Sequence, residues 1–149
     1  MNIAFFLIPK KDVVCLNIGS TMRQAVERME YHGYSAVPLL DDAGRYVGTL
    51  TEGDLLRKLK NTLFLTFSNM DQIKLGEIGR IKQNEPVRID AEITDLLSRA
   101  ATQNFVPVVD DQGIFIGIVR RREILGYFNK IFQAGQEKEG SETDWRKIP

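Results

Sequence analysis

The sequence has no excess of either charge and little sign of a membrane segment. It contains a single histidine and a single cysteine. Lys and Arg together number 20, as do Asp and Glu, so no overall field draws the protein onto nucleic acid or an anionic membrane. The apolar run Ile3 to Ile8 precedes Pro9 and is too short for a membrane span or a secretory signal. We expect a cytoplasmic protein with neither nucleic acid nor membrane as partner.

The scarcity of cysteine and histidine also limits the chemistry. Cys15 has no partner for an internal disulfide and lies in an apolar run, so a small core residue is favoured over a nucleophile. No nucleophile has a histidine and a carboxylate at a suggestive spacing, and Cys/His metal clusters and a phosphate-binding P-loop are absent from the sequence. We therefore predict that the protein is not an enzyme, with no catalytic residues, no metal and no cofactor.

The sequence does contain the same unit twice. Residues 36–56 and 105–125 align at a shift of 69 and share seven identities in 21 positions. Seven of the other 14 positions exchange one apolar residue for another. A similarity at a fixed shift indicates a repeated supersecondary unit.

Each copy has the pattern of a strand, a helix, a strand, a turn, a strand and a second helix. Apolar residues at i, i+3, i+4 and i+7 predict one helix face in each copy; they are Met22, Ala25, Val26 and Met29, then Ile93, Leu96, Leu97 and Ala100. Ser20 or Thr21 is predicted to cap the first helix, and Gly33 to end it. The predicted strands are residues 13–16, 36–40, 46–50, 87–89, 105–109 and 114–119. We predict an α+β fold in which two strand-helix-strand-strand-helix repeats pair to complete one core.

Composition divides the chain further. Residues 64–73, between the copies, are compatible with a helix, and the end of the chain turns polar, as in a disordered tail. Trp145 stands out in that tail, where a frayed end is favoured over docking on a partner subunit. The predicted divisions are a first repeat with the N-terminal segment at 1–60, a linker at 61–73, a second repeat at 74–132 and the tail at 133–149.

One short motif in the first copy has chemical meaning. Thr51 and Asp54 lie where the third strand gives way to a helix, and free N–H groups and the helix dipole favour an anion there. Asp54 can accept hydrogen bonds from vicinal ribose hydroxyls, and Thr51 can donate one to a phosphate. The structural alternative is that Thr51 caps the helix and Asp54 complements its dipole.

Together, the doubled unit, the approach Tyr34-Ser35-Ala36-Val37-Pro38 and the ending Gly-apolar-x-Thr-x-x-Asp resemble a cystathionine-β-synthase (CBS) domain pair over about residues 5–132. The resemblance implies two repeats related by a pseudo-two-fold axis, with clefts between them. It implies a regulatory module that binds an adenosine nucleotide such as AMP, ADP or ATP and signals to an effector protein. Cyclic di-AMP is an alternative ligand, a homodimer is expected, and a ligand-free dimerisation or adaptor scaffold is the competing interpretation.

The resemblance also implies site residues. It assigns ribose to Asp54 and phosphate to Thr51, whereas the second copy has Arg120 and Glu123 in the corresponding places. Three arginines at a helix start oppose the dipole, but guanidinium groups suit phosphate oxygens, so we expect them to clamp phosphates rather than form a solvated basic patch. The predicted nucleotide-binding residues are Tyr34, Ser35, Ala36, Pro38, Thr49, Thr51, Asp54, Arg120, Arg121 and Arg122.

Overall fold

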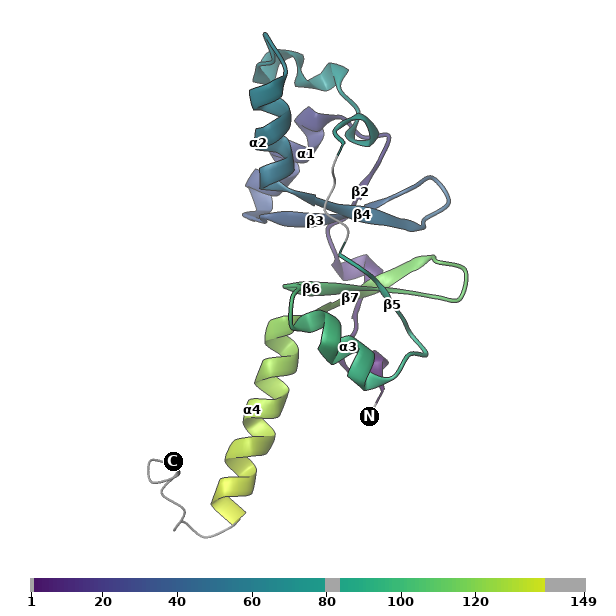
Figure 1. The fold of residues 1–149 in the computed structure, drawn as a ribbon, viewed down its shortest axis with the longest axis vertical. Coiled ribbons are helices and arrows are strands. Elements are labelled where there is room, and N and C mark those ends of the chain that lie inside the picture. Colours follow the sequence, from purple (N-terminus) through teal and green to yellow (C-terminus); the bar gives the residue numbers. More distant parts are fainter. Residues whose placement is uncertain (1, 80–83, 139–149) are drawn as a thin grey trace.

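The computed structural model describes residues 2–79 and 84–138. It has two halves, each with a small sheet and two helices, and the sheets face each other with the helices outermost (Figure 1). The first half has the strand order β2-β3-β4, in which β3 pairs parallel with β2 and antiparallel with β4. Its elements are β2 (Leu16–Asn17), α1 (Met22–His32), β3 (Ala36–Leu40), β4 (Tyr46–Thr51) and α2 (Glu52–Asn61).

The second half repeats this arrangement and adds one strand. Its strand order is β1-β7-β6-β5, in which β6 pairs parallel with β5 and antiparallel with β7. The elements are β5 (Val87–Arg88), α3 (Ile93–Ala100), β6 (Phe105–Val109), β7 (Phe115–Arg120) and α4 (Arg121–Lys138). The extra strand, β1 (Ile8–Pro9), comes from the N-terminal segment and pairs antiparallel with β7. Helix α4 extends away from the body of the second half (Figure 1).

The predicted fold class and the two strand-helix-strand-strand-helix repeats are confirmed. Thr21 begins α1 with a reciprocal cap, because its hydroxyl accepts from the Gln24 amide and the Gln24 side chain accepts from the Thr21 amide. Gly33 ends the helix with φ at 68°, a left-handed conformation that glycine adopts at little cost. The first strand differs from its predicted range, since residues 13–15 precede β2 rather than belong to it.

The two halves meet through reciprocal contacts. The Tyr46 amide donates to the Gly113 carbonyl at 3.3 Å, and the Phe115 amide donates to the Gly44 carbonyl at 3.0 Å. Because Gly44 matches Gly113 and Tyr46 matches Phe115 in the repeat alignment, these two bonds are related by the pseudo-two-fold axis. A cluster of buried side chains that includes Leu40 from the first half and Phe115 from the second fills the space behind them.

The N-terminal segment packs against the second half, whereas the predicted division groups it with the first repeat along the chain. Ile3 and Phe6 are buried in the second hydrophobic core, and Ile8 pairs with β7. Gly117 permits this close approach, since a Cβ atom there would lie 2.1 Å from the Ile8 carbonyl oxygen. The segment thus covers an edge of β7 that would otherwise be open.

The predicted linker and tail also have structure. Residues after α2 pack onto the first half, where Met70, Leu75 and Ile78 join its core, and the predicted helical stretch at 64–73 is a 3₁₀ helix over Phe67–Gln72. Helix α4 continues to Lys138, past the predicted start of the tail at residue 133. The remainder of the tail, with Trp145, lies outside the described residues. No helix in the described part of the chain is long and apolar enough to cross a membrane.

Candidate functional site

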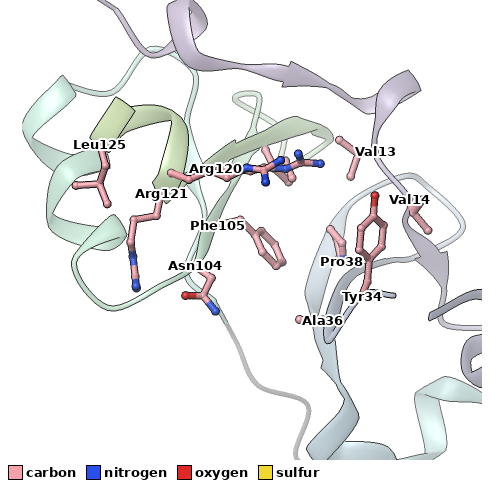
Figure 2. A pocket seen from close by; sticks show the side chains of 12 residues that line it. Val13, Val14, Tyr34, Ala36, Pro38, Asn104, Phe105, Arg120, Arg121 and Leu125 are labelled. Carbon is pink, nitrogen blue, oxygen red and sulfur yellow. The ribbon is translucent and has the colours of Figure 1, made fainter. Parts of the chain in front are cut away.

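A cavity of about 430 Å³ lies between the two halves (Figure 2). Its volume is in the range of small-molecule sites, which measure roughly 300–1,000 Å³. The first half contributes Val13, Val14, Tyr34, Ala36 and Pro38, and the second contributes Asn104, Phe105, Ile118, Arg120, Arg121, Arg122 and Leu125. We call this cavity the arginine cleft.

The two hairpins explain how these side chains reach one space. Side chains two residues apart on a strand share a face, so Ala36 and Pro38 of β3 point the same way, as do Ile118 and Arg120 of β7. In the second hairpin Phe105 is directly opposite Arg120 in the pairing register. Each hairpin therefore presents a row of alternate residues to the cleft, and the pseudo-two-fold packing sets the two rows against each other.

The charge of the cleft comes from the junction of β7 and α4. Arg120 is the last residue of β7, and Arg121 and Arg122 are the first of α4. The Arg121 Nε donates to the Ala100 carbonyl at 2.7 Å, which leaves its terminal nitrogens available to a ligand. None of the twelve lining residues is Asp or Glu, so the cleft is cationic although the chain is neutral overall. An anion bound there would offset the clash between the arginines and the positive end of the helix dipole.

Two aromatic rings from opposite halves form the apolar part of the cleft. Tyr34 follows α1, and Phe105 begins β6. Figure 2 shows both side chains directed into the space between the halves. The His32 ring stacks on Tyr34, with centroids 5.3 Å apart and planes 11° from parallel. A planar base would find aromatic surface on either side of this space.

The structure brings together six of the ten predicted nucleotide-binding residues. Those that line the arginine cleft are Tyr34, Ala36, Pro38, Arg120, Arg121 and Arg122. The other four, which are not among its lining residues, are Ser35, Thr49, Thr51 and Asp54. The Thr51 hydroxyl accepts from the Asp54 amide at 3.1 Å, and the Asp54 carboxylate accepts from the Thr51 amide at 2.9 Å. These two residues thus form the reciprocal cap of α2.

Six lining residues were not predicted from the sequence: Val13, Val14, Asn104, Phe105, Ile118 and Leu125. The repeat alignment contains a signal for three of them, because Asn104, Phe105 and Ile118 occupy the places of the predicted site residues Ser35, Ala36 and Thr49. No comparable signal exists for Val13 or Val14, which lie just before β2.

Other reactive groups give little chemistry. Burial raises the pKa of the Cys15 thiol, and this favours the protonated form over the nucleophilic thiolate. Within the described ranges, no three His, Cys, Asp or Glu side chains come together in a way that would hold a metal ion.

The family model for the CBS domain matches residues 7–61 and 78–130. The chain belongs to the CBS-domain family, and each of the two matched segments covers one repeat. It is 26% identical over 130 residues to cyclic di-AMP receptor B of Bacillus subtilis (strain 168), a match that covers 84% of each chain.

Solved structures give the same result. CbpB in complex with c-di-AMP superimposes with a TM-score of 0.83 at 25% identity, over 93% of this chain and 91% of CbpB. CBSX2 in complex with AMP gives a TM-score of 0.67 at 22% identity, over 87% of this chain and 97% of CBSX2, a likeness that shows the fold alone. The resemblance inferred from the sequence is confirmed, and relatives of this chain bind adenine nucleotides.

Proposed function

We propose that the protein is a regulatory module that binds an adenosine nucleotide in the arginine cleft and signals to a partner protein. The observation that supports this most directly is the placement of three arginines at one end of a cavity that has aromatic walls and no carboxylate. Guanidinium groups bind phosphate oxygens with paired hydrogen bonds. The cleft therefore combines a surface for a base with donors for a phosphate.

Each part of the ligand has a proposed partner. Arg120 and Arg122 neutralise phosphate, and Arg121 does so while its Nε holds the Ala100 carbonyl at the end of α3. The base lies between Tyr34 and Phe105. Since Arg121 joins the cleft to both α3 and α4, a bound phosphate would tighten the contact between these helices. That coupling offers a route by which occupancy alters the helical surface that a partner can bind.

Among adenosine nucleotides, we propose cyclic di-AMP as the ligand. AMP, ADP and ATP carry a free ribose 2′,3′-diol, for which a carboxylate is the natural partner, and none lines this cleft. A cyclic dinucleotide has its 3′ oxygens esterified and carries two charged phosphodiesters, which suits a site rich in arginine. The similarity to a cyclic di-AMP receptor supports the same choice.

Isothermal titration calorimetry and thermal shift on the full chain test this proposal. The panel contains AMP, ADP, ATP, S-adenosylmethionine, cyclic di-AMP and cyclic di-GMP. We expect cyclic di-AMP to bind most tightly and to raise the melting temperature most, since a ligand bound only by the folded state stabilises it by mass action. Tighter binding of ATP or AMP than of cyclic di-AMP would contradict the choice of ligand, but it would not contradict the assignment of the binding site to the arginine cleft.

A matched pair of variants tests the site. Arg120→Gln removes a guanidinium from the cleft, and Arg88→Gln removes one that pairs with Asp90 on the exposed surface. We expect weaker binding only for Arg120→Gln. If no nucleotide in the panel binds the wild-type protein, the scaffold interpretation replaces this one.

We also propose that two chains associate through their helical faces. Helix α4 has exposed apolar residues at helical spacing, namely Leu125, Phe128 and Phe132, and a groove beside α1 and α2 is lined by apolar side chains such as Val26 and Leu56. A second copy offers the complementary surface for each. Light scattering should give the mass of a dimer for the wild type and of a monomer for Phe128→Glu. A monomeric wild type would contradict the proposal.

A further inference from the structure

We propose that each chain binds one nucleotide, because the counterpart of the arginine cleft across the pseudo-two-fold axis is closed by its own polar side chains. This inference rests on the proposed function and fixes its stoichiometry. It also gives the Thr51 and Asp54 motif a structural role, in place of the ribose and phosphate contacts expected from the sequence. We call this second region the sealed cleft.

The repeat alignment defines which residues belong to the sealed cleft. Thr49 takes the place of Ile118, and Thr51 that of Arg120. Gln103 takes the place of Tyr34, and Asn84 that of Val13 at the upstream shift of 71. Polar residues thus replace apolar or aromatic ones at three of these four positions.

Burial separates the two clefts. Four polar or charged side chains are buried in the described part of the chain, and three of them, all except Asp54, occupy positions of the sealed cleft. The four are Thr49 at 0% exposed, Asp54 at 3%, Asn84 at 6% and Gln103 at 8%. In the arginine cleft, by contrast, Tyr34 is 37% exposed. Buried polar groups are usually hydrogen-bonded. The partners of Thr49 and Gln103 show what fills the space, whereas the side-chain oxygen of Asn84 has no hydrogen-bond partner in the described structure.

A chain of hydrogen bonds through Tyr46 joins the two halves there. The Tyr46 hydroxyl donates to the main-chain carbonyl of Asn84 at 2.8 Å. Its oxygen lies 2.7 Å from the Thr49 Oγ1, which must be the donor because the single tyrosine proton is already used. The residue that matches Tyr46 in the second half is Phe115. Since phenylalanine has no hydroxyl, this hydrogen-bonded link between the halves exists at the sealed cleft and has no counterpart at the arginine cleft.

The neighbouring groups of the sealed cleft are also engaged. The Gln103 Nε2 donates to the Glu85 carbonyl at 3.2 Å, whereas its counterpart Tyr34 faces the open arginine cleft. The Asp54 Oδ2 accepts from the Thr51 amide and hydroxyl, both at 2.9 Å. The Asp54 Oδ1 accepts from Arg57 Nη1 at 3.2 Å. Both carboxylate oxygens therefore already have protein donors, and a ribose diol would have to compete with them.

Calorimetry on the full chain with cyclic di-AMP and with ATP tests the inference. We expect one binding event per chain for whichever nucleotide binds. Asp54→Asn keeps the size of the side chain and removes its charge, and Tyr46→Phe removes the hydroxyl and gives the first half the residue of the second. For both variants we expect a dissociation constant within about twofold of the wild type, and a melting temperature lower by about 2–8 °C, since the lost bonds are structural.

The outcomes separate this inference from the proposed function. Two binding events per chain would overturn the inference alone, as would a loss of affinity of about tenfold or more in Asp54→Asn. A failure of every nucleotide to bind would overturn the proposed function and the inference together. If Asp54→Asn fails to fold, Tyr46→Phe provides the same test, because its counterpart Phe115 shows that this fold accommodates phenylalanine at that position.

Discussion

The arginine cleft and the sealed cleft are built from the same backbone and differ in the side chains at matching positions. In the first, Ile118 and Arg120 face a cavity between the halves. In the second, Thr49 and Thr51 at the same places are bonded to protein groups. The hydrogen-bonding capacity of a hydroxyl is easily satisfied by a neighbouring residue of the fold. A guanidinium has five N–H donors, and several of them stay available to a ligand.

This difference shows how a duplicated unit can divide its roles. The reciprocal backbone bonds of Tyr46 and Phe115 hold the halves together whatever the cleft residues are. Side chains at the ends of β4 and β7 can therefore change without loss of the fold. In the first half they cap α2 and seal the interface, and in the second they are free to bind a ligand.

The largest effect is expected from Arg120→Thr, which gives the second half the residue of the first. Hydrogen bonds to charged groups contribute about 1.5–3 kcal/mol, so nucleotide affinity should fall about 10- to 100-fold. Stability should change little, because the described structure shows no ion pair for Arg120. Calorimetry and urea denaturation measure the two quantities. Unaltered affinity would remove the main distinction between the clefts.

The next effect concerns the strand that only the second half has. Gly117→Ala places a Cβ 2.1 Å from the Ile8 carbonyl oxygen, so β1 must shift away from β7. We expect a loss of about 1–3 kcal/mol in the free energy of unfolding, typical of overpacking, and faster hydrogen exchange at residues 3–9. If exchange there stays slow, the N-terminal segment does not depend on this close approach.

A smaller effect is expected from Thr51→Ala, which removes the cap of α2. The loss of an N-cap hydroxyl costs about 0.5–2 kcal/mol, and urea denaturation should show it. Nucleotide affinity should stay the same, in contrast to Arg120→Thr at the matching position. A strong loss of affinity in Thr51→Ala would reverse the assignment of roles to the two clefts.

The smallest effect is a dependence of stability on alkaline pH. Burial raises the pKa of Tyr46 to about 12, whereas an unfolded tyrosine has a pKa of about 10. The folded state thus favours the protonated phenol, and this contribution to stability is complete below pH of about 10 and declines as the pH rises through 12. The difference in unfolding free energy between the wild type and Tyr46→Phe should shrink over that range. A constant difference would contradict a buried, bonded hydroxyl.

Much of the fold could be predicted from the sequence because local patterns determine it. The strands at 36–40 and 105–109 have the predicted bounds, since short apolar runs between turn residues leave little choice. The cap at Thr21 and the stop at Gly33 follow from local backbone chemistry. The N-terminal segment was harder to place, because an apolar run of six residues fits either half equally well by pattern alone.

The candidate site divides in the same way. The sequence determined that two copies of one unit exist, and that Thr51 and Asp54 are replaced by Arg120 and Glu123 in the second copy. Because the chain has no net charge, it also determined that a charged ligand must be bound by a local group of charged side chains. Only the tertiary structure decided which cleft is open. Hydrogen bonds such as that from Tyr46 to Asn84 join residues 38 positions apart, and their formation depends on how the halves pack rather than on any local pattern.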